Sequence, residues 1–155
     1  MMKQDTAVRI EISVAAPVDR AFAVFVEQIG SWWPHTYQIA AGQLAAVLVE
    51  PKQGGRWYER AQDGTECDWG EVLEWDPPHH VALSWAITPS WQSAPPDQAS
   101  RIDVRFTSTG PGSTQVVLIH SELDRHGEGW ETMREAVAGP TGWTAILAGY
   151  AKAAA

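Results

Sequence analysis

Cysteine is almost absent from this sequence. Its 155 residues include a single cysteine, Cys67, which excludes an internal disulfide and any zinc site built from several cysteines. The sequence therefore predicts a protein of a reducing compartment. Glu66 and Asp68 flank Cys67. Because their negative charges disfavour a thiolate, Cys67 is not predicted to be a reactive nucleophile.

Basic residues are also few. The sequence holds 11 Lys and Arg against 19 Asp and Glu, for a formal net charge of -8. These basic residues are scattered, whereas a surface that binds nucleic acid or an anionic membrane needs them clustered. We therefore expect neither nucleic acid nor a membrane among the partners of this protein.

Long apolar runs and the signature motifs of common chemistries are missing as well. No stretch approaches the about 18 apolar residues that cross a membrane, and residues 1–6 lack the pattern of a secretory signal. We therefore expect a cytoplasmic protein. The sequence has no phosphate-binding loop, nucleophile elbow or metal-ligand spacing, and the adjacent His79 and His80 side chains should diverge. We expect no metal and no cofactor.

Tryptophan, in contrast, is abundant. Nine tryptophans are spread from the first third of the chain to its last helix: Trp32, Trp33, Trp57, Trp69, Trp75, Trp85, Trp91, Trp130 and Trp143. A buried indole must pack a large ring and find an acceptor for its N–H, so this number predicts an aromatic-lined interior. Their spread favours a pocket assembled by the fold. The alternative, that each ring only fills a core, stays open.

Periodicity divides the chain into elements. Apolar and polar residues alternate over 8–14, which is typical of a half-buried strand. Pro17 suits a first helical turn, and an apolar stripe continues toward Gly30, with a bend or second short helix over 31–34. Strand patterns separated by turn residues then cover 44–50, 56–60, 66–76, 80–88, 101–108 and 114–123.

The last part of the chain is helical in pattern. Gly139 and Pro140 interrupt it, and one apolar face predicts a helix over 142–151 followed by a frayed tail. That face consists of Trp143, Ile146, Leu147 and Tyr150. Because helices do not alternate with strands, we predict one α+β domain over 1–155. It should be a curved antiparallel sheet of six or seven strands, two short helices after the first strand, and a long C-terminal helix across the concave face.

A series of short motifs runs through the chain in order. They are Ala16-Pro17-Val18, Ala21-Phe22 with Phe25, Trp32-Trp33-Pro34, Gly54-Gly55-Arg56-Trp57, Gly70 with Val72 and Glu74, Asp76-Pro77-Pro78, Val81 with Leu83 and Trp85, Ser100-Arg101-Ile102 with Val104, Gly112-Ser113-Thr114, His120, and Gly142-Trp143. Their order and spacing resemble those of the SRPBCC (START/Bet v 1-like) superfamily over residues 8–152. Within it, the chain is most similar to the Hsp90-ATPase-activator-like (AHSA1-like) proteins.

The resemblance implies a helix-grip fold, in which the sheet wraps the C-terminal helix around a deep, mostly apolar cavity. It also implies ligands such as lipids, sterols, polyketides or plant hormones. Some members of the superfamily are cyclases or hydratases, and one eukaryotic branch binds Hsp90. This chain shows no second domain of the kind that the co-chaperone carries, which disfavours Hsp90 activation.

Strand alternation selects the residues that would line such a cavity. Trp85 and Phe106 should point inward if their strands have apolar inner faces, and Trp57 shares a face with Glu59. The side on which Trp69 lies stays open, because Gly70 can mark a bulge that changes the alternation.

His120 is the titratable residue that we rank first. It follows Leu118 at a two-residue step, so both side chains should share the inner face. A histidine in an apolar pocket can bind a ligand carbonyl or act as a general acid or base, although a purely structural role stays open. Glu59 is the candidate partner of His120, with a solvated carboxylate at the strand rim as the alternative.

Three functions follow from these residues. The first is a binding protein for a small apolar or aromatic molecule, lined by Trp33, Trp57, Glu59, Trp69, Trp85, Phe106, Leu118, His120, Trp143, Leu147 and Tyr150. The second is a polyketide cyclase or hydratase in which His120 moves a proton. The third is a module that contacts a chaperone. We favour the first because His120 is the one credible acid or base, and we expect a monomer or homodimer.

Overall fold

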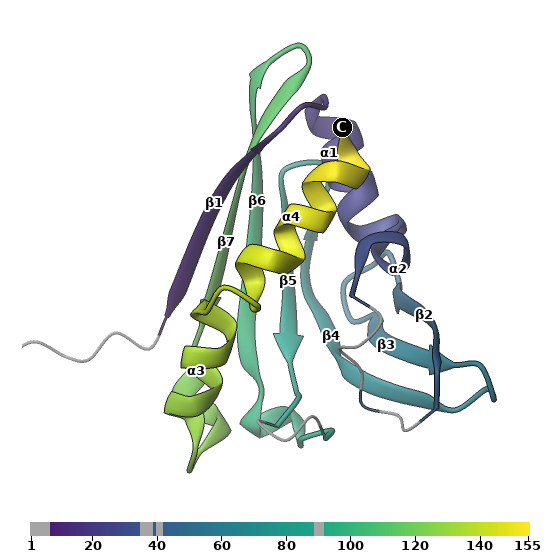
Figure 1. The fold of residues 1–155 in the computed structure, drawn as a ribbon, viewed down its shortest axis with the longest axis vertical. Coiled ribbons are helices and arrows are strands. Elements are labelled where there is room, and N and C mark those ends of the chain that lie inside the picture. Colours follow the sequence, from purple (N-terminus) through teal and green to yellow (C-terminus); the bar gives the residue numbers. More distant parts are fainter. Residues whose placement is uncertain (1–6, 35–38, 40–41, 89–91) are drawn as a thin grey trace, which may run out of the picture.

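Seven antiparallel strands form a single sheet in the order β1-β7-β6-β5-β4-β3-β2 (Figure 1). A computed structural model describes residues 7–34, 39, 42–88 and 92–155; Trp91 lies outside these. The strands are β1 (Val8–Val14), β2 (Leu44–Val49), β3 (Arg56–Ala61), β4 (Glu66–Asp76), β5 (His80–Trp85), β6 (Ser100–Gly110) and β7 (Ser113–Ser121). Every strand after β1 pairs with its neighbour in the chain, as the short connections predict, and β7 closes back on β1.

Helices cover one face of this sheet. They are α1 (Val18–Glu27), α2 (Ile29–Trp32), α3 (Trp130–Ala138) and α4 (Trp143–Ala154), with short 3-10 turns η1 (Pro96–Gln98) and η2 (Leu123–His126). Figure 1 shows α4, in yellow, running across the sheet between α3 and α1. The α+β helix-grip architecture is therefore confirmed. None of the helices in the described part of the chain is long and apolar enough to span a membrane.

The end of α4 is more ordered than the sequence predicted. The expected fraying after residue 151 is wrong: the helix continues to Ala154, whose side chain is buried. Arg20 of α1 explains this difference, because its Nε donates a hydrogen bond of 2.8 Å to the carbonyl of Ala154. The last four carbonyl groups of a helix have no hydrogen-bond partner within the helix, and a guanidinium at this end can donate to them.

Two predicted strands are shorter in the structure. The run over 80–88 stops as a continuous strand at Trp85, although Ile87 still forms an isolated bridge. The run over 114–123 ends at Ser121 because Glu122 adopts a left-handed conformation with φ of 58°. This residue turns the chain into η2, so alternation no longer governs which side the following side chains face.

A bulge in β4 decides which of its side chains face the helices. Trp57 of β3 pairs with Gly70, but the next residue of β3 pairs with Asp68, so Trp69 is the extra residue. Trp69 and Val72 are consequently both buried on the inner side, which resolves the side of Trp69 that the sequence left open at Gly70. Gly70 is required here, because a Cβ atom on it would lie 1.9 Å from the backbone oxygen of Ser84.

Candidate functional site

Five indole rings meet beneath one end of α4. We call this group the tryptophan cluster: Trp33 follows α2, Trp57 lies on β3, Trp69 on β4, Trp85 on β5 and Trp143 begins α4. Trp69 lies 4.9 Å from Trp33 and 5.5 Å from Trp57, measured between ring centroids, and Trp85 lies 5.8 Å from Trp143. All contacts are tilted or edge-on, the geometry that aromatic quadrupoles favour. All five rings are buried.

The hydrogen bonds of these indoles are unequal. The N–H of Trp69 donates to Glu59 Oε1 at 2.8 Å, and that of Trp143 donates to His120 Nδ1 at 3.0 Å. The N–H of Trp57 is also buried, yet it has no partner among the described residues. Leaving a buried donor unsatisfied costs about 1–3 kcal/mol. The cluster therefore presents an N–H that a hydrogen-bond acceptor in contact with Trp57 would satisfy.

Glu59 is a buried carboxylate in this cluster. Its exposed fraction is 0%, so the alternative of a solvated rim carboxylate is wrong. Its Oε1 accepts hydrogen bonds from the Trp69 indole and from the backbone N–H of Ile39. The expected contact between Glu59 and His120 is not made, because the two ring nitrogens of His120 bond to other residues.

The hydrogen-bond network around His120 includes two residues that sequence reasoning missed. Ser100 Oγ lies 2.7 Å from His120 Nε2 and 2.7 Å from His126 Nε2, and all three side chains are buried. Ser100 could have been found, since it precedes the inward-facing Ile102 by two residues. No comparable signal exists for His126, because the left-handed Glu122 interrupts the alternation before η2.

Burial keeps these imidazoles neutral. The protein interior, and secondarily the nearby His126, lower the pKa of His120 to about 3. Burial likewise lowers the pKa of His126. His120 is therefore an uncharged hydrogen-bonding group near neutral pH, and both of its nitrogens are occupied.

Four predicted lining residues lie outside the tryptophan cluster: Phe106 on β6, Leu118 on β7, and Leu147 and Tyr150 on α4. Tyr150 and Phe106 both pack edge-on against Phe25, at 5.1 and 5.7 Å between ring centroids. The Tyr150 hydroxyl donates to the Ala21 carbonyl at 2.7 Å, and burial raises the pKa of Tyr150. Leu118 and Leu147 are fully buried. Seven of the eleven predicted residues thus form the tryptophan cluster and its polar partners, and of the other four, Phe106 and Tyr150 pack against Phe25 of α1.

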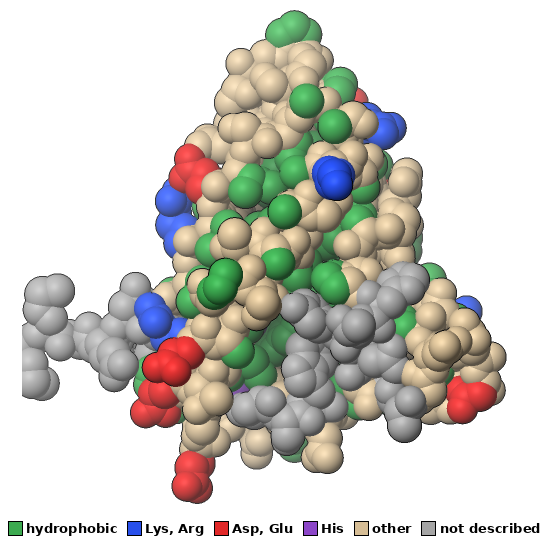
Figure 2. Space-filling view, in the orientation of Figure 1, with side chains coloured by type: hydrophobic (Ala, Val, Ile, Leu, Met, Phe, Trp, Pro, Cys, Tyr) green, Lys and Arg blue, Asp and Glu red, His purple; other side chains and the backbone are tan. Residues whose placement is uncertain are grey.

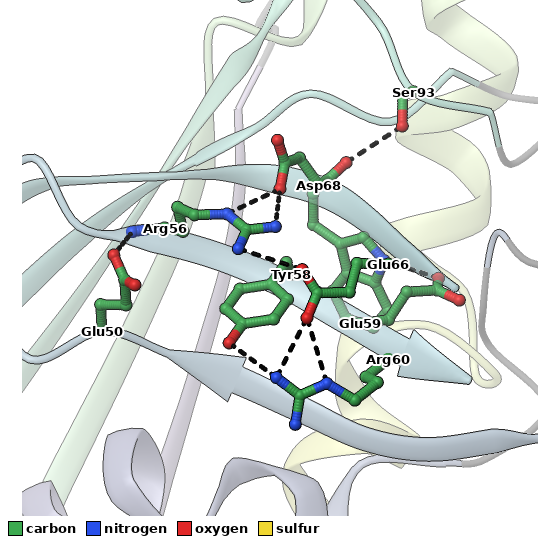
Figure 3. A network of polar contacts seen from close by, with 9 residues as sticks. Glu50, Arg56, Tyr58, Glu59, Arg60, Glu66, Asp68 and Ser93 are labelled. Carbon is green, nitrogen blue, oxygen red and sulfur yellow. Dashed lines mark hydrogen bonds and ion pairs between the residues drawn. The ribbon is translucent and has the colours of Figure 1, made fainter. Parts of the chain in front are cut away.

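The outer face of the sheet carries a separate ionic network (Figure 3). Arg56 pairs with Asp68 at 2.8 Å and with Glu66 at 3.2 Å, and Arg60 pairs with Glu66 at 3.0 Å. These pairs tie β3 to β4.

An outer cleft of about 500 Å³ lies beside them and includes Cys67. Burial, followed by the charges of Glu59 and Asp68, raises the pKa of Cys67, which agrees with an unreactive thiol.

One group of side chains on the sheet has the donor atoms of a metal site. The group consists of Glu74, His80 and Asp103, whose metal-binding atoms lie within 4.8 Å of one another. It is the one such group among residues 7–34, 39, 42–88 and 92–155. Arg101 forms ion pairs with both carboxylates, and His80 bonds Asp103 at 2.8 Å. The guanidinium thus supplies the positive charge that these carboxylates attract, and we assign no metal to them.

Acid should destabilise this protein through its buried histidines. An unfolded histidine takes up a proton near pH 6.5, whereas folded His120 does so only near pH 3. The contribution of His120 to the free energy of unfolding is therefore fully present above about pH 6.5. It falls as the pH drops from there toward the folded pKa. From pH 7.5 to pH 5, His120 alone should remove about 2 kcal/mol of unfolding free energy. Urea titrations at both pH values measure this loss.

The matched variant for this measurement is His120→Gln, whose side chain does not titrate. Its unfolding free energy should fall by about 2 kcal/mol less than that of the wild type over the same pH interval. Equal pH dependence in the two proteins would contradict the assignment of a depressed His120 pKa.

The comparisons with known proteins agree with this fold. Residues 15–154 match the sequence model of a family described as Activator of Hsp90 ATPase homolog 1-like protein. No curated protein matches the chain. Among solved structures, an anthrahydroquino-γ-pyrone synthase, Txn09, complexed with SUM, is 42% identical, with 98% of this chain and 99% of that chain covered and a TM-score of 0.68.

Two further structures show how far the likeness extends. CalC, a self-sacrificing resistance protein from Micromonospora echinospora, is 27% identical, covering 97% of this chain and 94% of its own, with a TM-score of 0.67. Protein NE0264 from Nitrosomonas europaea is 16% identical over 99% of this chain and 97% of its own, with a TM-score of 0.68. The last of these supports the fold alone.

Proposed function

The chain belongs to the family of Activator of Hsp90 ATPase homolog 1-like proteins, and from that premise we propose that it binds a planar, oxygen-bearing aromatic molecule of the polyketide type. The proposed site is the tryptophan cluster with Glu59 and His120 at its edge. Figure 2 shows hydrophobic side chains gathered on the face that α4 crosses, with charged groups mostly toward its margins.

The observation that carries the proposal is the buried, unpaired N–H of Trp57. A cluster that only filled space would be more stable with a ring that has no donor, because an orphaned N–H keeps its desolvation cost. A ligand oxygen would remove that cost. Flat rings would gain stacking and edge contacts with the indoles, and each Å² of apolar surface buried would contribute about 25 cal/mol.

The relative at 42% identity supports this ligand class. Its name describes a synthase of a fused aromatic system that contains a pyrone ring, which is flat and carries several oxygens. Both chains are covered almost completely in that comparison. We infer that the present chain takes a molecule of similar shape and polarity.

We expect anthraquinone to quench the tryptophan emission saturably and to bind more tightly than anthracene. The two molecules share one ring skeleton, and anthraquinone adds carbonyl oxygens that can accept from Trp57. Trp57→Phe keeps an aromatic ring and removes the donor. It should weaken anthraquinone binding by one hydrogen bond, about 0.5–1.5 kcal/mol, and leave anthracene binding unchanged. Fluorescence titration of both proteins with both compounds measures these four affinities.

Two results would count against the binding proposal. One is the absence of saturable quenching by either compound, which would leave the cluster as a filled core. The other is an equal loss of affinity for both compounds in Trp57→Phe, which would remove the N–H from the recognition.

A second candidate function is ring closure on the bound molecule, because the 42% identical relative is named a synthase. An ortho-hydroxynaphthyl β-diketone, which forms a fused γ-pyrone with loss of water, is a suitable test compound. If His120 moves a proton, His120→Gln should lower turnover about 10²–10⁴-fold. Affinity should change by no more than about 0.5–1.5 kcal/mol. Chromatography of the product measures turnover, and titration measures affinity. Product formation at the wild-type rate in His120→Gln would exclude His120 from catalysis.

A further inference from the structure

A continuous chain of hydrogen bonds leads from the tryptophan cluster toward the protein surface. It starts at the Trp143 indole, 3.0 Å from His120 Nδ1, and continues from His120 Nε2 to Ser100 Oγ at 2.7 Å. Ser100 Oγ then lies 2.7 Å from His126 Nε2. The exposed fraction rises from 0% at His120 to 9% at His126, and exposed residues flank His126 on both sides.

The chemistry of the end group fixes the tautomer of His120. An indole N–H can only donate, so His120 Nδ1 must be unprotonated, and the neutral ring carries its hydrogen on Nε2. That hydrogen is donated to Ser100 Oγ. The single hydrogen of the Ser100 hydroxyl then has two acceptors within reach: His126 Nε2 at 2.7 Å and the Trp85 carbonyl at 3.5 Å. The 2.7 Å contact fits donation in either direction, and the relay requires the one in which Ser100 donates and His126 Nε2 accepts.

With Ser100 donating to His126, every donor in this chain points outward. Trp143 donates to His120, His120 donates to Ser100, and Ser100 donates to His126. This is the arrangement in which a proton delivered at the inner end can be passed along by a shift of each hydrogen to its acceptor. Because one proton leaves Nε2 as another arrives at Nδ1, the buried His120 ring never has to hold two.

We propose that Ser100 and His126 act as relay residues that carry a proton between a ligand hydroxyl bound at His120 and the protein surface. The inference rests on the proposed function, since it takes the ligand to be an oxygen-bearing aromatic molecule in the tryptophan cluster. A ligand hydroxyl takes the place of the Trp143 N–H as the donor to His120 Nδ1. Neither relay residue touches the ligand, so each acts through His120.

The transfer balances at every step. The ligand O–H bond breaks as the H–Nδ1 bond of His120 forms, and the H–Nε2 bond breaks as its proton joins Ser100 Oγ. The original Ser100 proton moves to His126 Nε2, which leaves an imidazolium near the surface and an oxyanion on the ligand. When that oxyanion adds to a carbonyl carbon of the same molecule, the new alkoxide takes the proton back from Nδ1. The relay then runs in reverse and restores the starting tautomers.

The proton positions can be tested without any ligand. Long-range ¹H–¹⁵N NMR spectra of the free protein near neutral pH should show His120 protonated on Nε2 and His126 protonated on Nδ1. A His120 ring protonated on Nδ1, or a His126 ring protonated on Nε2, would overturn the relay, because one link would then lack a donor or an acceptor. This result stands whether or not the proposed ligand binds.

The transfer itself can be tested with alizarin, a hydroxylated anthraquinone whose visible absorption changes when a hydroxyl ionises. We expect Ser100→Ala to slow the ionisation of bound alizarin after a stopped-flow pH jump at least about tenfold, as loss of a proton-transfer group does. Ser100→Thr keeps the hydroxyl and should retain the wild-type rate. His126→Phe keeps a ring of similar shape without the acceptor and should be as slow as Ser100→Ala.

The controls separate this proposal from the binding proposal. Tryptophan quenching by alizarin should be the same in the wild type and in all three variants, because no relay residue touches the ligand. Absence of quenching in the wild type would contradict the proposed function, and the tautomers measured by NMR would then decide the relay. Normal quenching with equal ionisation rates in wild type and Ser100→Ala would overturn the relay and leave the binding proposal intact.

Discussion

Trp143→Ala is expected to lower the free energy of unfolding by about 3–5 kcal/mol, the range for truncating a large buried aromatic side chain. The Trp143 ring contacts Trp33 at 5.9 Å and Trp85 at 5.8 Å between centroids, so its removal leaves a cavity bordered by two other indoles. It also removes the donor to His120 Nδ1 and leaves a buried acceptor unsatisfied. Both effects act in the same direction.

Urea or guanidinium denaturation of the two proteins measures this loss. Trp130→Ala is the matched control, because Trp130 lies in α3 and is only partly buried. Its substitution removes the same number of atoms and should cost clearly less. A change below about 0.5 kcal/mol in Trp143→Ala, which is typical of surface positions, would contradict the placement of this residue at the centre of the cluster.

Gly70→Ala is expected to cost about 3 kcal/mol or more, at the upper end of the range for overpacking. The added Cβ would lie 1.9 Å from the Ser84 carbonyl oxygen, and a backbone oxygen cannot rotate away as a side chain can. β4 and β5 would have to separate locally. That shift would strain the hydrogen bond of 2.8 Å from Glu71 N to Ser84 Oγ and move Trp69 within the tryptophan cluster.

Gly112→Ala provides the control for this prediction. A Cβ at Gly112, in the turn between β6 and β7, would meet no atom within 4 Å, so the same chemical change should alter stability by less than about 0.5 kcal/mol. Thermal or chemical denaturation compares the two variants. Comparable stabilities for Gly70→Ala and Gly112→Ala would show that the bulge can relax around a methyl group.

The sequence by itself determined the order and type of the elements. Alternation with a period of two predicted β1 and the later strands, and the apolar stripe from Trp143 to Tyr150 predicted α4. These patterns are readable because each depends on residues a few positions apart, within one element. The inward position of Trp85 followed from the same local alternation.

Tertiary structure decided the chemistry of the site. The extra residue at Trp69 depends on how closely β4 can approach β5, a distance that no local pattern encodes. Ser100 joins His120 and His126 although the chain separates it from them by 20 and 26 residues. A hydrogen bond forms only when donor and acceptor lie within about 3 Å and in line. That condition is met by the register of β6 against β7 and by the turn at Glu122, so the partners of the buried polar groups emerge only once the sheet is assembled.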